Sequence, residues 1–223
     1  MKKHFSIFMC LFLALSSFLV SCGDSKNDPY NGHEYVDLGL PSGIKWATCN
    51  VGATKPEEFG GYYAWGETEE KENYDLSTYK WCKGDNDNMT KYCTDSDYGR
   101  VDNKTVLEPQ DDVAHVKWGG TWRMPTTDEQ RELLNECSWE WTELNGVPGY
   151  TVTGPNGNSI FLPAAGYRLG SGVYLRGSYG YYWSSSLFSN YSYFAYFLNF
   201  YSGDHDWDYN YRFYGQSVRP ISK

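Results

Sequence analysis

Several features that most catalytic sites depend on are missing from this sequence. It has only four histidines in 223 residues, and His33, His115 and His205 lie in unrelated segments. No Gly-Xaa-Ser-Xaa-Gly elbow, phosphate-binding loop or dinucleotide fingerprint occurs. No cysteine follows Cys137, and no cysteine pair has the close CxxC spacing of zinc or redox sites. We therefore expect neither an enzyme nor a bound cofactor or structural metal ion.

Basic residues are also scarce. The chain has 19 lysines and arginines against 28 aspartates and glutamates, which gives a formal charge of −9 at pH 7. Lysine is absent altogether between Gly177 and Gly215. Because phosphate backbones repel so acidic a chain, the composition argues against nucleic acid as a partner.

One long hydrophobic run, Phe5 to Val20, follows the basic start Lys2-Lys3-His4. A membrane-spanning helix needs roughly 20 apolar residues, so this run is too short and is typical of a secretory signal. It ends in Leu19-Val20-Ser21-Cys22, which resembles the lipobox of bacterial lipoproteins. The resemblance implies cleavage before Cys22 and lipid, palmitate among it, on that residue. We expect a signal peptide at 1–21, a flexible tether at 22–32, and a surface-exposed protein anchored in the cell envelope at the outer membrane.

Apart from the lipid-bearing Cys22, four cysteines remain after such cleavage, and an even number in an exported chain permits disulfides. Cys82 and Cys93 bracket the polar loop KGDNDNMTKY, so we predict a disulfide between them. Cys49 and Cys137 lie in apolar contexts and are candidates for buried thiols.

Residues 33–223 have the length of a single domain. The stretch at about 67–112 is polar and poorly periodic, and we interpret it as an insertion held by the disulfide and by Trp81. The clearest helix follows Pro125, where either Thr126 with Glu129 or Thr127 with Gln130 satisfies the capping-box pattern. The other expected elements are a weaker helix at 111–116 and strands at 35–40, 44–51, 150–153, 159–162, 181–185, 193–201 and 216–221. This pattern predicts an α+β domain.

Five ordered motifs also occur in one known family. They are WATCNVG (46–52), WGGTWRMPTTDE (118–129), PAAGYR (163–168), GYYWSSS (180–186) and GQSVRPI (215–221). The chain resembles the Fibrobacter succinogenes major paralogous domain family, which is common among lipoproteins of gut Bacteroidetes. That family is similar to C-type-lectin-like and formylglycine-generating-enzyme-like folds. The resemblance implies two short helices, a twisted and mostly antiparallel sheet, and long loops on one side. The enzymes among these relatives use a cysteine pair near the carboxyl end, which this chain lacks.

Aromatic residues are concentrated near the end of the chain. Between Tyr179 and Tyr214, 17 of 36 residues are aromatic, including 10 of the 21 tyrosines. If 193–201 is a strand, its side chains alternate between two faces. We expect the more apolar face to be buried and the other to be displayed. The first comprises Phe194, Tyr196, Leu198 and Phe200; the second comprises Tyr193, Ala195, Phe197, Asn199 and Tyr201.

The following stretch, Gly203 to Tyr214, contains no aliphatic residue, and we interpret it as a recognition loop. Tyrosine with Asn, Ser, Asp and Gly is typical of such loops, and exposed rings also stack on sugars. We therefore predict a lipid-anchored binding protein for an extracellular glycan or protein. The predicted ligand-binding residues are Phe188, Asn190, Tyr191, Tyr193, Phe197, Asn199, Tyr201, Asp204, His205, Asp206, Asp208, Tyr209, Asn210, Tyr211, Phe213 and Tyr214.

Three other interpretations of this segment stay open. In the first, its rings fill a core or a subunit interface of a structural envelope protein; we expect Trp183, Trp207, Arg212 and Arg219 to be structural in either case. Oxygen ligands for calcium are available from Asp204, Asp206, Asp208 and Asn210, although such acids are more often solvated. Finally, lectin-fold targets of diversity-generating retroelements are rewritten by adenine mutagenesis in this terminal position. The Asn, Tyr, Ser, Asp, His, Phe and Gly found from Phe188 to Tyr214 are what rewritten AAC codons produce.

Overall fold

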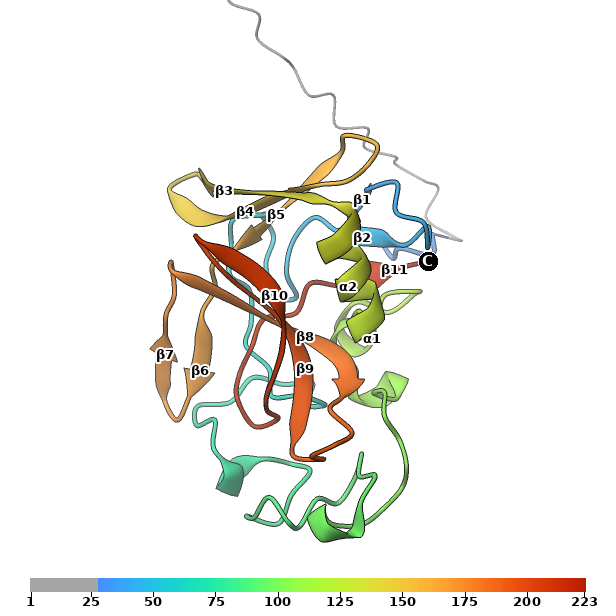
Figure 1. The fold of residues 1–223 in the computed structure, drawn as a ribbon, viewed down its shortest axis with the longest axis vertical. Helices are drawn as coiled ribbons and strands as arrows, with labels where there is room; N and C mark the ends of the chain where they lie inside the picture. The colour runs from blue at the N-terminus through green and yellow to red at the C-terminus, as the bar shows by residue number, and fades with distance from the viewer. Residues whose placement is uncertain (1–27) are drawn as a thin grey trace, which may run out of the picture.

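The computed structural model describes residues 28–223, which form two α-helices and four small antiparallel sheets (Figure 1). The predicted signal peptide and the lipid-bearing Cys22 lie outside these residues. The α+β prediction is confirmed. The helices are α1 (Val113–Trp118) and α2 (Thr127–Glu136), and the strands are β1 (Tyr35–Asp37), β2 (Lys45–Ala47), β3 (Ser138–Leu144), β4 (Val147–Thr153), β5 (Ser159–Pro163), β6 (Tyr167–Leu169), β7 (Gly172–Tyr174), β8 (Tyr179–Leu187), β9 (Phe194–Tyr201), β10 (Asp204–Tyr211) and β11 (Ile221–Ser222).

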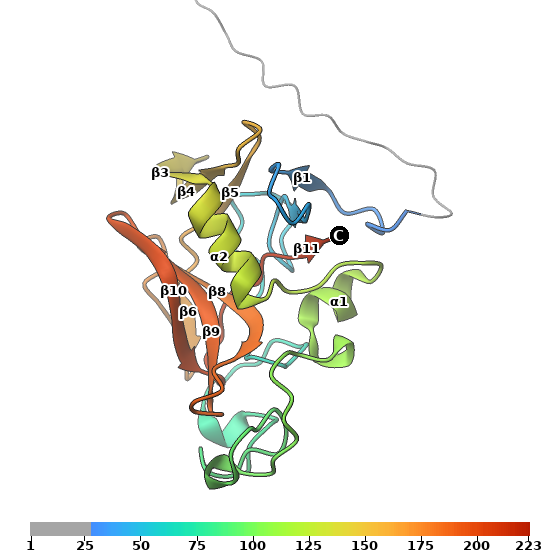
Figure 2. The same cartoon turned by 45° about the vertical axis from the view of Figure 1, so that its right-hand side comes forward.

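The first and last strands of the described chain lie in one sheet. Strand β2 pairs with β1 on one side and with β11 on the other, so Ile221 lies opposite Trp46. The remaining sheets have the orders β3-β4-β5, β10-β9-β8 and β6-β7. Figures 1 and 2 place the carboxyl end beside the β1-β2-β11 sheet, on the opposite side of α2 from β10. No helix among residues 28–223 is long and apolar enough to cross a membrane.

Helix α2 begins where the capping-box pattern predicts. Of the two possible registers the chain uses Thr126 with Glu129: the Thr126 hydroxyl accepts from the Glu129 amide, and the Glu129 carboxylate accepts from the Thr126 amide at 2.8 Å. Helix α1 is shifted two residues from its predicted start. Its cap is Asp112, because Pro109 to Asp111 forms a short 3₁₀ turn instead.

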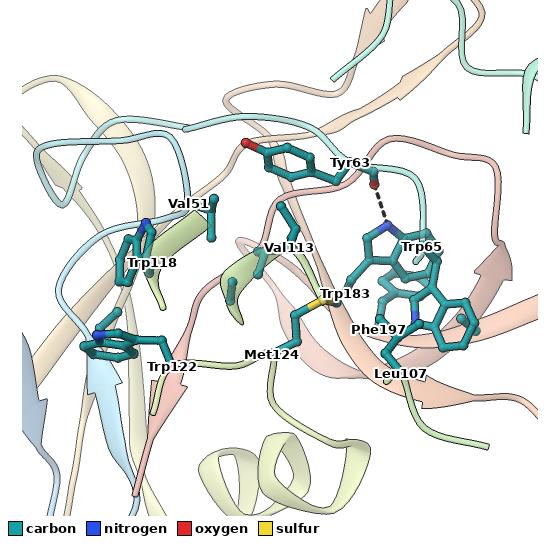
Figure 3. Packing of buried hydrophobic residues seen from close by; sticks show 14 of the residues in the cluster. Val51, Tyr63, Trp65, Leu107, Val113, Trp118, Trp122, Met124, Trp183 and Phe197 are labelled. Atoms are coloured by element: carbon teal, nitrogen blue, oxygen red, sulfur yellow. Dashed lines mark hydrogen bonds between the residues drawn. The ribbon is translucent and has the colours of Figure 1, made fainter. Parts of the chain in front are cut away.

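Two aromatic cores lie on opposite sides of the β8–β10 sheet. One contains Trp65, Trp118, Trp122 and Trp183, and the Trp183 indole donates to the Tyr63 carbonyl at 2.8 Å (Figure 3). The other is built on β4, β5 and α2. Strand β9 passes between them, with Ala195 and Phe197 in the first core and Leu198 and Phe200 in the second.

The position of β9 corrects one prediction. Phe197 was expected on the displayed face, but its side chain is only 3% exposed, and Ala195 is also buried. A single alternating pattern assumes that one face of the strand meets water. Here Phe197 and Leu198, in the middle of the strand, are buried on opposite faces, so neither face is exposed along its whole length.

The segment at 67–112 is irregular, with three 3₁₀ turns at Leu76–Thr78, Ser96–Tyr98 and Pro109–Asp111. Its predicted disulfide is wrong: all four cysteines of the described residues are free. The Cys82 thiol donates to the Leu76 carbonyl and the Cys93 thiol to the Asp95 carbonyl, both at 3.0 Å, so the two sulfur atoms serve different turns.

Other contacts hold this segment in place. As expected, Trp81 contributes, because its indole donates to the Gly66 carbonyl at 2.8 Å. The buried guanidinium of Arg212 donates to the carbonyl of Ser192 at 2.7 Å and to that of Tyr92 at 3.2 Å. It also donates to the Tyr79 hydroxyl at 2.9 Å. Arg212 thus joins the end of β10 to the insertion, in the structural role that the sequence suggested.

Candidate binding surface on the β8–β10 sheet

Strand β10 occupies the stretch that the sequence predicted as a loop. A two-residue turn, Ser202-Gly203, joins it to β9, and the pairing runs in register from Asp204 opposite Tyr201 to Tyr211 opposite Phe194. The signal was present in the sequence: acids and an amide alternate with rings from Asp204 to Tyr211. This is the period of a strand, but its polar half is built from residues that disfavour strands.

The alternation sends two sets of side chains to opposite faces of the sheet. Trp207 lies on the face covered by α2, where the Arg131 guanidinium is 4.3 Å from the centre of its ring. The side chains of His205, Tyr209 and Tyr211 project from the same face of the sheet as Trp207, because each is an even number of positions away from it. The other face receives Asp204, Asp206, Asp208 and Asn210.

One end of the α2 face is covered by other elements. His205 stacks on Trp139 of β3 with ring centres 4.7 Å apart, and Tyr150 of β4 packs edge-on against Phe200. His205, predicted to bind ligand, is therefore half-buried and packs within the molecule.

The other end of this face is open. Helix α2 has 10 residues and is about 15 Å long, whereas the 8 residues of β9 extend about 27 Å. The uncovered rings form a continuous cluster in which Phe188 stacks on Tyr209 at 4.2 Å, and Tyr196 lies 5.2 Å from Phe188 and 5.5 Å from Trp207. We call this cluster the ring patch; it comprises Phe188, Tyr191, Phe194, Tyr196, Trp207 and Tyr209.

Three residues of the ring patch were not among the predicted site residues. Phe194 and Tyr196 were assigned to the buried face of their strand, and Trp207 was expected to be structural. All three keep partial exposure because α2 ends before it reaches them or covers only one side of the ring. The length of a covering helix relative to its sheet is not visible in the periodicity of either element.

The opposite face carries the acids. Asp204, Asp206 and Asp208 are exposed, and none forms an ion pair with another residue in 28–223. Tyr201 lies 5.2 Å from Tyr179 across the strand pair. We call this surface the aspartate face; it comprises Tyr179, Tyr181, Asn199, Tyr201, Asp204, Asp206 and Asp208.

Tyr181 connects the aspartate face to the β6–β7 hairpin. Its ring lies 5.0 Å from Tyr167 of β6. Burial, followed by the nearby Tyr167, Tyr179 and Asp208, raises the pKa of Tyr181 to about 12. This hydroxyl therefore stays protonated and can donate a hydrogen bond at neutral pH.

The remaining predicted residues lie at the edges of these two surfaces. Tyr193 packs against Tyr98 of the insertion at 5.2 Å, and Tyr214 stacks on Tyr167 at 5.5 Å. Tyr211 and Phe213 are half-buried beside them. The others are Asn190, which is exposed in the turn between β8 and β9, and Asn210, which is half-buried on β10.

The structure does not assemble the acids into a calcium site. Among residues 28–223 no three His, Cys, Asp or Glu side chains come together as metal ligands. Neighbouring aspartates of β10 are separated by about 7 Å along the strand, because alternate residues of a strand are that far apart.

Comparison with known proteins finds one family model that matches the part of the chain carrying this surface. A family model described as "Domain of unknown function (DUF8237)" matches residues 138–221. The matched region runs from β3 into β11 and includes both the ring patch and the aspartate face, yet covers less than half of the chain. No curated protein and no solved structure matches the chain.

Proposed function

We propose that this chain is a lipid-anchored, non-catalytic cell-surface protein that binds an extracellular ligand, glycan or protein, through the β8–β10 sheet. One observation carries the proposal. Tyr191, Trp207 and Tyr209 of the ring patch are 43%, 36% and 42% exposed, and Tyr201 of the aspartate face is 39% exposed, although each belongs to or adjoins a well-packed strand. Contiguous exposed rings on a soluble surface mark interaction sites.

The support beneath these rings favours binding. The strands are held by two aromatic cores and by Arg212, so a ligand would meet side chains that are already ordered. Tyrosine then adds contact area at the cost of only two side-chain torsions. The aspartate face adds exposed carboxylates that form no ion pair within residues 28–223, and the Asn199 amide, whose buried oxygen has no hydrogen-bond partner among these residues.

We further propose that the fold is C-type-lectin-like and that the chain belongs to the Fibrobacter succinogenes major paralogous domain family. Two short helices, predominantly antiparallel strands and paired first and last strands support this assignment. The motif at 118–129 spans the end of α1 and the cap of α2, and the motif at 215–221 contains the buried Arg219. These two family motifs thus contain residues that cap a helix or are buried in the fold.

Diversification of the segment is a related proposal. Exposed positions such as Asn190, Tyr191, Tyr201, Asp204, Asp206 and Asp208 hold residues that adenine mutagenesis yields, whereas Arg212 and Trp183 are buried framework. Sequencing of the flanking DNA tests this. A near-copy of the last coding segment that differs at adenines, beside a reverse transcriptase, would support diversification, and an intact flank without either would refute it.

A binding assay tests the function itself. The soluble chain from residue 23 is applied to an array of defined oligosaccharides and to mucin glycoprotein before and after enzymatic deglycosylation. Loss of binding after deglycosylation identifies a glycan ligand, and its persistence identifies a protein ligand. We expect Tyr191→Ala/Tyr209→Ala to weaken binding at least tenfold, since each lost stacked ring costs about 1–3 kcal/mol.

The matched control is Tyr174→Ala, which removes an equally exposed tyrosine from strand β7. It should bind as the wild type does. Equal binding by the double variant and the wild type would refute the role of the ring patch. Binding by a Tyr201→Ala variant tests separately whether the aspartate face contacts the ligand.

A further inference from the structure

Strand β10 is the outer strand of its sheet, and none of the other strands in residues 28–223 pairs with its outer side. In an antiparallel hairpin with a two-residue turn, the closing pair, Tyr201 and Asp204, exchanges hydrogen bonds. Every second residue from Asp204 therefore directs its backbone amide toward β9. The amides of His205, Trp207, Tyr209 and Tyr211 point outward.

Each of these outward amides has a partner. It donates to the side-chain oxygen of the residue before it. The distances are 2.9 Å for His205 to Asp204, 2.7 Å for Trp207 to Asp206, 2.7 Å for Tyr209 to Asp208 and 2.8 Å for Tyr211 to Asn210. The same arrangement thus occurs four times along one edge.

An exposed edge strand ordinarily offers unpaired amides to a strand from another molecule. Here an incoming strand would first have to displace a carboxylate or amide oxygen at every second residue. We propose that Asp204, Asp206, Asp208 and Asn210 cap the β10 edge and prevent a second copy of this chain from pairing with it. This inference is independent of the proposed ligand-binding function.

Capping requires a side-chain oxygen at these residues, whereas charge repulsion requires a negative charge. The three aspartates would also repel a second copy through their charge. Asn210, however, makes the same hydrogen bond without a charge, so an amide oxygen in this position is sufficient for the cap. Replacement by asparagine therefore retains the caps and removes the charge, whereas replacement by alanine removes both.

The test compares Asp204→Ala/Asp206→Ala/Asp208→Ala with Asp204→Asn/Asp206→Asn/Asp208→Asn in the chain from residue 23. Light scattering after size exclusion, over a hundredfold range of concentration, gives the association constant. We expect the alanine variant to associate at least tenfold more tightly than the wild type and the asparagine variant to match the wild type. An alanine variant as monomeric as the wild type would overturn the proposal, and so would equal association of both variants.

A proline locates the contact. Proline is tolerated on an edge strand where its missing amide points outward. Adding Tyr209→Pro to the alanine variant should abolish the new association, whereas adding Tyr209→Ala, which loses the same ring but keeps the amide, should not. Association that survives the proline would place the contact elsewhere and overturn the proposal.

Hydrogen exchange tests the four caps in the chain without any substitution. The four capped amides should exchange at least tenfold more slowly than amides of exposed residues without a hydrogen-bond acceptor in residues 28–223, such as those of Lys83 and Asp85 in the insertion. Exchange at the rate of free amides would contradict the caps even if the alanine variant failed to fold.

Discussion

Two fully buried arginines, Arg212 and Arg219, fix the end of the chain, and neither has a carboxylate partner among residues 28–223. Arg219 donates to the Asn50 side chain and to the carbonyls of Ala47, Thr48 and Phe161, all within 3.0 Å. Burial lowers the pKa of Arg219 from its ordinary value. Such a guanidinium satisfies several carbonyls at once, because its five N–H groups lie in a fixed fork.

Arg212 offers the sharpest test at this scale. Arg212→Met should lower the free energy of unfolding by about 3–5 kcal/mol, because it leaves the Tyr79 hydroxyl and the Tyr92 and Ser192 carbonyls buried without a donor. Urea denaturation gives the value. The control is Arg100→Met on the exposed surface, which should change stability by less than about 0.5 kcal/mol. Equal changes in the free energy of unfolding for the two substitutions would show that the buried Arg212 guanidinium is not needed for stability.

At the scale of elements, sequence patterns located both helices and seven of the eleven strands, and missed β3, β6, β7 and β10. The start of α2 was readable from Thr126 and Glu129, because a capping box is a local feature. Strand β10 was hidden because Asp and Asn normally favour turns. Strand β3, rich in Trp and Glu, was also missed. It forms because its pairing with β4 lets Trp139 and Trp141 pack against Tyr150.

The insertion is the element on which sequence and structure disagree most directly. Alkylation of the denatured chain from residue 23 without reductant should modify all four cysteines, Cys49, Cys82, Cys93 and Cys137, as intact-mass measurement will report. Two unmodified cysteines that react only after reduction would restore the Cys82–Cys93 disulfide. Reductant should also leave the melting temperature unchanged, since Trp81 and Arg212 hold this segment instead.

At the scale of the whole molecule, the α+β class and the location of the exposed rings were predictable, but their division between two surfaces was not. Composition placed the candidate site between Phe188 and Tyr214. Only packing could show that Phe197 belongs to a core, and that α2 and β3–β5 cover one end of a face while leaving the other end open. These facts depend on which elements meet in space and on their relative lengths.

The central claim is that the ring patch on the β8–β10 sheet faces solvent and does not support the core. Urea unfolding of Tyr191→Ala/Tyr209→Ala beside Phe197→Ala tests it most directly. We predict a loss of no more than about 1 kcal/mol for the exposed pair and of about 3–5 kcal/mol for Phe197, which is buried on the same sheet. A loss for the tyrosine pair as large as that for Phe197 would contradict the account, because those rings would then belong to the core.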